Sequence, residues 1–342
     1  MSEVNLEEAL NRHQMTLSPD AVSQLRRLLG DNVSEEEITD GVVHQVVRLK
    51  SSRSLVILKH RGFHCRRIPT APLDPHDVRF EARALQLLNS LFPNLFPALL
   101  YFDEIAHTLI LSDLAAVDLE EGRRFLNSAS PQRLKLGCNL IVQTLAECHR
   151  SMRQSLPDVS LRPDGDQAFF NRNMFERIGY HGTEAAEALV QALAKLPRQL
   201  IIGDFGPKNM LIGEHSFRVF DLEHVHRGPV VFDVAFFLAH VVLHRMHTDS
   251  AEAIQALIDE LLVNYESVYS MNSDDRVVIG PIIAAVMAYR LKNPIVPYAL
   301  NLTDEFRERQ AQESLAAITF ATTKSPGEHI AASLQRAGVP AA

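Results

Sequence analysis

The sequence lacks tryptophan and has only three cysteines, Cys65, Cys138 and Cys148, among 342 residues. Three irregularly spaced cysteines are too few for a disulfide framework or a zinc cage, which favours a reducing compartment. Positive charge is also scarce, because 34 Lys and Arg face 42 Asp and Glu for a formal net charge of -8. This balance gives no electrostatic reason to expect nucleic acid or an anionic membrane as a partner, so we expect a small ligand bound in a cleft.

Long apolar runs are missing as well. The most apolar stretch, 230–242, is interrupted by Asp233 and His240, and it is shorter than the roughly 20 residues of a membrane span. The start of the chain is polar and acidic, without the basic leader and apolar run of a signal peptide. We therefore expect no transmembrane segment and a cytoplasmic protein, with a homodimer left open. The 46% apolar and 22% charged content is that of an ordinary globular chain.

Strand-like patterns come first along the chain and helical patterns follow. The expected early elements are two helices ending near residue 29, strands over 41–49 and 55–59, a proline-containing loop over 61–75, a helix over 77–91 and a strand over 109–111. From about residue 113 the pattern turns helical, with a long amphipathic helix over 131–152. The sequence thus predicts an α+β fold with a small β-rich lobe over 1–112, a large helical lobe over 113–323 and a loosely held tail over 324–342.

The most informative stretch runs from Ile202 to Glu223. Two short β-rich runs flank a turn, so polar side chains at their outer ends are expected to face one cleft. Asp204 precedes Asn209 by five residues, and Asp221 follows the second run. Phosphoryl transfer needs a carboxylate to orient and deprotonate a hydroxyl, and an amide with a second carboxylate to hold magnesium. The spacing matches the kinase pattern D-x-x-x-x-N, with turn and helix capping as the alternative.

The β-rich lobe offers an independent check, since a kinase needs a strand lysine and a helix carboxylate that holds it. Lys59 ends the second predicted strand. Glu81 shares a helical face with Leu85 and Leu88. A carboxylate on an apolar face needs a cation to offset its desolvation, and Lys59 is the best candidate. A solvated Glu81 is the alternative.

The stretch 38–46 occupies the place of a phosphate-covering loop. It holds one glycine, Gly41, rather than a glycine series. Backbone amides around Asp40 and Gly41 can approach a triphosphate in this position. An ordinary β-turn is the other interpretation.

These motifs, over about 38–243, resemble the aminoglycoside phosphotransferase, choline kinase and methylthioribose kinase superfamily, which has a two-lobed protein-kinase-like fold. The family motifs H-G-D-x-x-x-x-N, I-D-x-E and G-P-x-x-F-D-x-A correspond to 202–209, 220–223 and 228–235. The resemblance implies these roles: catalytic base Asp204, magnesium ligands Asn209, Asp221 and Glu223, nucleotide-binding Lys59, Glu81, Asp40 and Gly41, a hinge with adenine-binding backbone at Ser112 and Leu114, and supporting Asp233 and His149.

The function implied by this resemblance is transfer of the γ-phosphoryl group of ATP, with Mg²⁺, to a hydroxyl of a small metabolite. Methylthioribose is the first substrate expected, with aminoglycosides and amino alcohols as related choices. Ile202 stands where the family usually has histidine. A kinase-fold protein that binds nucleotide without efficient turnover is therefore the alternative. A Ser/Thr protein kinase is disfavoured because no A-P-E segment follows Asp221.

Other basic residues have two interpretations. His240, His244 and His247 have metal-ligand spacing on one helix, but their apolar neighbours favour a core helix over a zinc site. Arg290 and Lys292 lie near a predicted helix end, where pairing with the helix dipole is favoured over contact with a substrate. The basic residues within 61–67 are expected to form a solvated surface.

Overall fold

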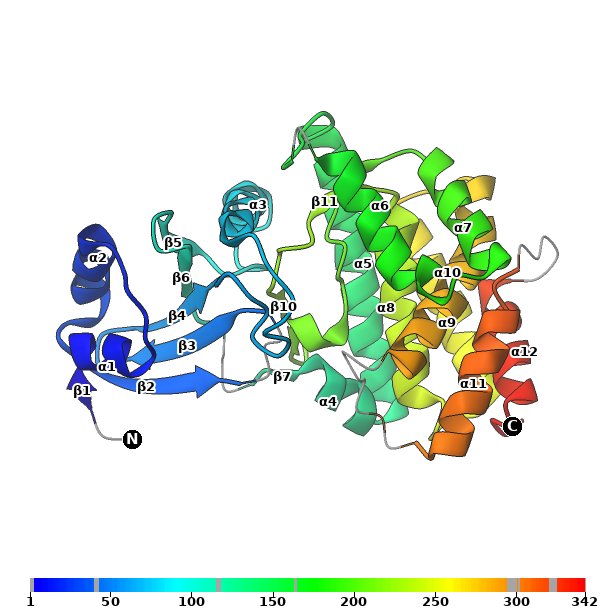
Figure 1. Cartoon of the computed structure of the whole chain (residues 1–342). Helices are drawn as coiled ribbons and strands as arrows, with labels where there is room; N and C mark the ends of the chain where they lie inside the picture. Colours follow the sequence, from blue (N-terminus) through cyan, green and yellow to red (C-terminus); the bar gives the residue numbers. More distant parts are fainter. Residues whose placement is uncertain are drawn as a thin grey trace. The chain divides into compact units, whose positions relative to one another are not determined.

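The computed structural model describes residues 3–39, 43–114, 118–162, 165–293, 300, 302–319 and 325–341. The chain divides into two compact units, which can be followed by colour in Figure 1. The first unit comprises Met1–Val117 and Arg218–Glu223, and the second comprises Asp118–Phe217 and His224–Ala342. The short return segment carries Asp221 and Glu223 into the first unit.

An antiparallel sheet of six strands, in the order β1-β2-β3-β4-β6-β5, forms the body of the first unit. The strands are β1 (Val4–Asn5), β2 (Asn32–Ile38), β3 (Gln45–Lys50), β4 (Leu55–His60), β5 (Leu99–Asp103) and β6 (Thr108–Ser112). Val47 and Leu49 on β3 and Val56 and Leu58 on β4 are buried, because alternate side chains of a strand share one face.

Helices complete the first unit. They are α1 (Leu6–Arg12), α2 (Pro19–Leu29), the 3₁₀ turn η1 (Pro75–Asp77) and α3 (Val78–Leu91). Leu6 of α1 and Leu25 of α2 join the apolar core under β3 and β4. The buried face of α3 carries Glu81, Leu85 and Leu88, as the helical spacing in the sequence predicts.

The second unit is mainly helical. Its helices are α4 (Gly122–Ser128), α5 (Pro131–Ser155), α6 (Asp166–Arg177), η2 (Gly179–His181), α7 (Glu184–Lys195), η3 (Pro207–Asn209), α8 (Val230–Arg245), α9 (Ala251–Glu266), α10 (Ser273–Lys292), α11 (Asp304–Ala316) and α12 (Pro326–Arg336). All residues of α8 are buried, so this mainly apolar helix lies in the core of the unit.

Short strands connect these helices to the loops that carry polar side chains. They are β7 (Glu120–Glu121), β8 (Gln199–Ile201), β9 (Met210–Ile212), β10 (Phe217–Val219), in which the chain passes into the first unit, and β11 (His226–Gly228). β8 pairs with β11, and β7 pairs with β9. The β8–β11 pair holds the start of the loop 202–209.

The expectation of a loosely held tail after residue 323 is wrong for the described part of that tail. Ser325 and Glu328 form a capping box that starts α12, a device that satisfies two backbone N–H groups at once. Ile330 and Leu334 of α12 are buried, and the helix packs on α9 and α10. Within the part of the chain that the structure describes, no helix has both the length and the apolar character required to cross a membrane.

Candidate active site

Lys59 and Glu81 form a buried ion pair in the first unit. Lys59, near the end of β4, is 6% exposed, and Glu81 on α3 is 1% exposed. The Nζ atom donates to Glu81 Oε1 at 2.8 Å and to Oε2 at 2.7 Å. The strand ammonium thus compensates the helix carboxylate for its lost hydration.

The return segment brings Asp221 to the same ammonium. Lys59 Nζ donates to Asp221 Oδ1 at 2.6 Å. Asp221 has a φ of 65°, a left-handed conformation that Asp tolerates better than most residues. The next amide, Leu222 N, donates to Glu81 Oε1 at 3.1 Å. Glu81 therefore holds both the ammonium and the backbone that presents Asp221.

The carboxylates around Lys59 keep it charged. Burial would lower the pKa of Lys59, but Asp221, Glu81 and Glu223 outweigh burial and raise it. For Glu81, burial raises the pKa of the carboxyl group, and the Lys59 ammonium opposes that change. Lys59 is therefore a cation at neutral pH. A phosphate oxygen that approaches its Nζ would compete with Asp221 for the same protons.

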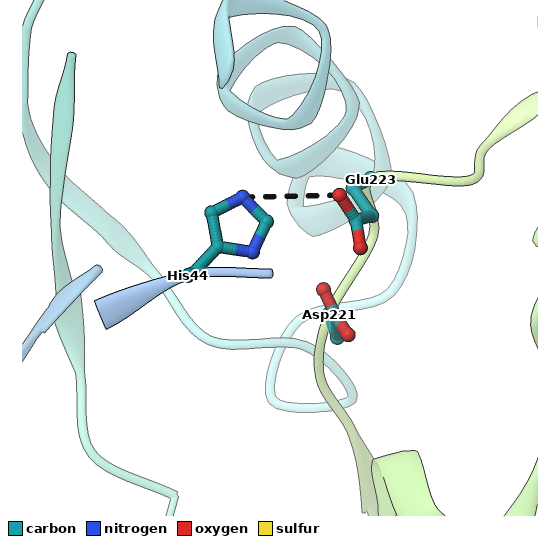
Figure 2. A group of neighbouring side chains, drawn as sticks. All are labelled: His44, Asp221 and Glu223. Carbon is teal, nitrogen blue, oxygen red and sulfur yellow. Dashed lines mark ion pairs between the residues drawn. The ribbon is translucent and has the colours of Figure 1, made fainter. Parts of the chain in front are cut away.

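His44 completes a group that the sequence reading missed. One ligand atom each of His44, Asp221 and Glu223 lies within 4.8 Å of the others, and Figure 2 shows the imidazole facing Glu223. His44 Nε2 is 3.8 Å from Glu223 Oε2. Burial and the nearby Lys59 hold the pKa of His44 well below its usual range, so the ring is neutral. A neutral imidazole beside two carboxylates can serve as a metal ligand.

Arg61 is the second buried cation of this group. Its Nη1 donates to Glu223 Oε2 at 3.0 Å and lies 3.2 Å from His44 Nε2. Its Nε donates to the carbonyl of Asp74 at 2.8 Å. The expectation of a solvated surface is therefore wrong for Arg61, which is 8% exposed. Its place beside other basic residues in the sequence suggested an exposed side chain. Its position two residues after Lys59 was the signal that it lies near the Lys59 group.

The predicted hinge is held by hydrogen bonds to Ala98 and by an ion pair with Arg48. Ser112 N donates to the carbonyl of Ala98 at 2.9 Å, and Ser112 Oγ accepts from Ala98 N at 2.8 Å. Asp113 pairs with Arg48, with Oδ2 2.6 Å from Nε, and Leu114 follows. Adenine binding by the backbone of Ser112 and Leu114 stays a prediction. The predicted phosphate-covering residues, Asp40 and Gly41, lie outside the described residues.

In the second unit, the loop 202–209 leaves β8 through a left-handed turn at Gly203. The φ of Gly203 is 80°, and a Cβ there would lie 2.3 Å from the carbonyl oxygen of His224. Only glycine fits, because any side chain would meet the backbone. The turn places Asp204 at a fixed point after the strand.

Asp233, in the first turn of α8, holds this turn from behind. Ile202 N donates to Asp233 Oδ2 and Gly203 N donates to Oδ1, both at 2.7 Å. His149 Nε2 lies 3.2 Å from Asp233 Oδ2, and its Nδ1 lies 2.7 Å from the hydroxyl of Tyr265. The backbone at Ile202 is thus anchored without any contribution from an Ile202 side-chain hydrogen bond.

Asp204 itself is buried and strongly paired. Asn209 Nδ2 donates to Asp204 Oδ2 and to its main-chain oxygen, both at 3.1 Å, and Lys208 Nζ is 2.8 Å from Oδ2. Burial would raise the pKa of Asp204, but the basic groups around it, led by Lys208 and Arg177, hold it well below its usual range. Asp204 is therefore an oriented carboxylate at neutral pH.

Two arginines reach the other oxygen of Asp204. Arg177 Nη2 and Arg290 Nη2 each lie 3.6 Å from Asp204 Oδ1. The preference for Arg290 as a partner of the helix dipole is therefore corrected, because this side chain is 3% exposed and faces the Asp204 carboxylate. Lys292 instead pairs with Glu308 at 3.1 Å. Arg177 was missed, since α6 carries no motif.

The histidines of α8 belong to the core. His240 Nδ1 is 2.7 Å from the carbonyl of Phe236, and His244 Nδ1 is 2.8 Å from Asn127 Oδ1. Among the residues with described side chains, His44, Asp221 and Glu223 form the group placed to hold a metal, and the α8 histidines do not. The structure therefore favours a core role for the histidines of α8 over a zinc site.

The predicted magnesium ligands divide between the units. Asp221 and Glu223 belong to the first unit, and Asn209 belongs to the second. All three offer oxygen atoms, which Mg²⁺ prefers. In the first unit, the donor chemistry of Asp221 and Glu223 therefore fits magnesium, while the nitrogen of His44 adds a ligand that suits Mn²⁺ and other transition metals.

An antiparallel sheet with a buried Lys–Glu pair, and a helical unit with an Asp–Asn loop, define the protein-kinase-like class. The family model described as "Phosphotransferase enzyme family" matches residues 36–269. The chain belongs to this family. The α+β, protein-kinase-like fold expected from the sequence is thereby confirmed.

Solved structures share this fold at low sequence identity. A Ralstonia eutropha protein proposed to be an aminoglycoside phosphotransferase is 11% identical, with a TM-score of 0.52 over 94% of this chain and 98% of its own. The choline kinase LicA from Streptococcus pneumoniae is 16% identical, with a TM-score of 0.51 over 87% and 98%. The amicoumacin kinase hAmiN, solved with AMP-PNP, Ca²⁺ and Ami, is 10% identical, with a TM-score of 0.53 over 92% and 93%.

Proposed function

We propose that this phosphotransferase is an ATP- and Mg²⁺-dependent kinase that phosphorylates a hydroxyl of a small molecule. The observation that carries the proposal is the state of Asp204, a buried carboxylate on a clamped loop with one oxygen bound by Asn209 and Lys208. The buried pair of Lys59 and Glu81 supports it from the nucleotide-binding side. Solved structures of the same fold include a choline kinase and an amicoumacin kinase.

The residues of each unit have separate tasks in this proposal. Lys59, held by Glu81, binds phosphate oxygens of ATP. Asp221, Glu223 and Asn209 hold Mg²⁺, which neutralises charge on the phosphates when bound. Asp204 accepts a hydrogen bond from the acceptor hydroxyl, orients it and takes its proton as the new bond forms.

Ile202 does not argue against catalysis in this protein. In the structure the main-chain N–H groups of Ile202 and Gly203 are held by Asp233. Because two charge-assisted hydrogen bonds fix the turn, a histidine side chain at residue 202 is not required to order it. This is our reason for preferring turnover over nucleotide binding alone.

For the acceptor, methylthioribose was the first choice from the sequence, with aminoglycosides and amino alcohols beside it. The test is acceptor-dependent release of ADP from Mg-ATP on a panel of these compounds, together with calorimetric titration of nucleotide. We expect turnover in the native protein and a loss of about 10³-fold in Asp204→Asn with nucleotide affinity kept. Glu214→Gln, at an exposed carboxylate ten residues further on, is the control. Nucleotide binding with no turnover on any acceptor would favour the non-catalytic alternative.

A further inference from the structure

The two oxygens of Asp204 have different surroundings. Asn209 and Lys208 both bind Oδ2. Oδ1 is buried and accepts no hydrogen bond from any residue that the structure describes. A buried carboxylate oxygen left without a hydrogen bond is costly. Oδ1 is therefore the oxygen that lacks a hydrogen bond, and an acceptor hydroxyl that supplied this bond would meet the groups around Oδ1.

Two guanidinium groups converge on Oδ1. Arg177 comes from the last turn of α6 and Arg290 from the last turn of α10, and each places Nη2 3.6 Å from Oδ1. Both side chains are buried, at 6% and 3% exposure. The distance is too long for a hydrogen bond, so the guanidinium groups flank the oxygen rather than cap it.

These arginines are held in place by their own contacts. The guanidinium carbons of Arg177 and Arg290 lie 5.8 Å and 5.4 Å from the ring centroid of Phe236, which stands in the centre of α8. Arg177 Nη1 also donates to Asn173 Oδ1, one turn earlier on α6. Cations stacked on an aromatic ring are pre-oriented. Their donors face a fixed direction beside Asp204.

The charges around Asp204 decide between classes of acceptor. Asp204 supplies one carboxylate, whereas Arg177, Arg290 and Lys208 supply three cations to it. A cationic acceptor, such as an amino alcohol or an aminoglycoside, would be repelled by the arginines that surround its hydroxyl. A guanidinium group matches a carboxylate or phosphate by paired N–H donors.

We propose that the phosphoryl acceptor is an anionic hydroxyl compound, with a carboxylate or phosphate close to the hydroxyl that reacts. This inference rests on the proposed kinase function. The hydroxyl donates to Asp204 Oδ1, and the anion binds Arg177 and Arg290. The hydroxyl oxygen forms a bond to the γ-phosphorus as the bond from that phosphorus to the bridging oxygen breaks, the proton passes to Asp204, and ADP leaves with the electron pair.

Four three-carbon compounds of nearly constant shape test the charge rule, which states that an anionic acceptor binds more tightly than a neutral or cationic one. Glycerate carries a carboxylate, glycerol 3-phosphate carries a phosphate, glycerol is neutral and 3-aminopropane-1,2-diol is a cation. Each is titrated into the full chain saturated with Mg²⁺ and AMP-PNP, and each is assayed for ADP release with Mg-ATP. We expect at least one anion to bind at least about 10-fold more tightly than glycerol, and the cation to bind more weakly. The stronger anion identifies carboxylate or phosphate.

Arginine variants assign the preference to residues. Arg290→Gln and Arg177→Gln should each reduce the ratio of anion to glycerol affinity by about 10- to 100-fold, because each removes a charge-assisted contact. Arg290→Lys should keep part of the ratio. Arg245→Gln is the matched control, since Arg245 is also buried in the second unit but pairs with Asp249. This control should leave the ratio unchanged.

The outcomes separate the two proposals. Equal or weaker binding of both anions relative to glycerol overturns the anionic acceptor. Anion preference that survives in both Gln variants does so as well. Turnover on a neutral or cationic acceptor with no dependence on Arg177 or Arg290 refutes this inference alone and leaves the kinase function standing. Failure of the protein to bind Mg-nucleotide refutes the kinase function, while the anion titration without nucleotide still decides the charge rule.

Discussion

Substitution of Asp233 by Asn tests the clamp that shapes the catalytic loop. The wild-type carboxylate accepts one backbone N–H on each oxygen, both at 2.7 Å, and is fully buried. The amide keeps the shape but turns an NH₂ group toward one of these donors. One hydrogen bond to a charged group, about 1.5–3 kcal/mol, is lost, and a buried N–H is left unpaired at about 1–3 kcal/mol more. We therefore expect a destabilisation of about 2.5–6 kcal/mol.

The chain offers a matched control in Asp103. This residue is 2% exposed and also accepts two backbone amides, from Ser18 at 2.7 Å and from Ala106 at 3.1 Å, but it lies in the first unit. Urea unfolding should show that Asp103→Asn is destabilised by a similar amount.

Activity should separate the two variants. Asp233→Asn should lower kcat by about 100-fold, because Asp204, the proposed catalytic carboxylate, loses its fixed position, whereas Asp103→Asn should leave kcat within threefold. The clamp would be refuted by an Asp233→Asn variant whose unfolding free energy and kcat both match wild type. Equal losses of kcat in both variants would show that general destabilisation, and not loop geometry, is measured.

Three further predictions address pH, metal and packing. Burial lowers the pKa of His226 to about 3, whereas the unfolded residue titrates at about 6.5. The stability contributed by the neutral ring is therefore fully present above about pH 6.5. The free energy of unfolding should fall by up to about 1.4 kcal/mol per pH unit as the pH decreases from there toward about 3. His226→Gln should flatten the pH dependence of urea unfolding by that amount, and an unchanged slope would contradict the burial argument. His44→Ala should weaken Mn²⁺ binding about 10-fold more than Mg²⁺ binding in calorimetric titrations, and equal losses would remove His44 as a ligand. Leu334→Ala should cost about 2–5 kcal/mol in thermal or urea unfolding if α12 is part of the core; a cost under about 0.5 kcal/mol would restore the view of a loose tail.

Local patterns predicted the parts of the fold whose side chains follow a simple period. The hairpin of β3 and β4, the buried face of α3 and the long helix α5 all have such patterns. Strand β2 was not predicted, because Glu35, Glu36 and Glu37 give no alternation of apolar and polar residues. In the structure Glu36 lies across the ladder from Arg48 and pairs with it at 2.7 Å, so cross-strand charge replaces alternating hydrophobicity.

The candidate site divides in the same way. The sequence singles out Asp204, Asn209 and Asp221 because the residues of the kinase motif occur at fixed spacings along the chain. Arg177 and Arg290 could not, since they stand on separate helices and meet only through packing around Phe236. Such residues have no spacing that a single sequence can reveal. In the proposed function, they are also the residues that distinguish one acceptor from another.

The carboxylates that the proposed function uses, where the structure describes them, are already paired with cations of their own unit. Asp221 is bound by Lys59 and Glu223 by Arg61, while Asp204 is flanked by basic side chains on both oxygens. Removing one member of a buried pair leaves an uncompensated charge, which costs far more than the net value of the pair. Ligand phosphates and metal ions would therefore act by exchanging partners within these groups. In the proposed function, a metal cation would reach Asp221 by displacing Lys59, and the released ammonium would then be the group that meets the phosphate.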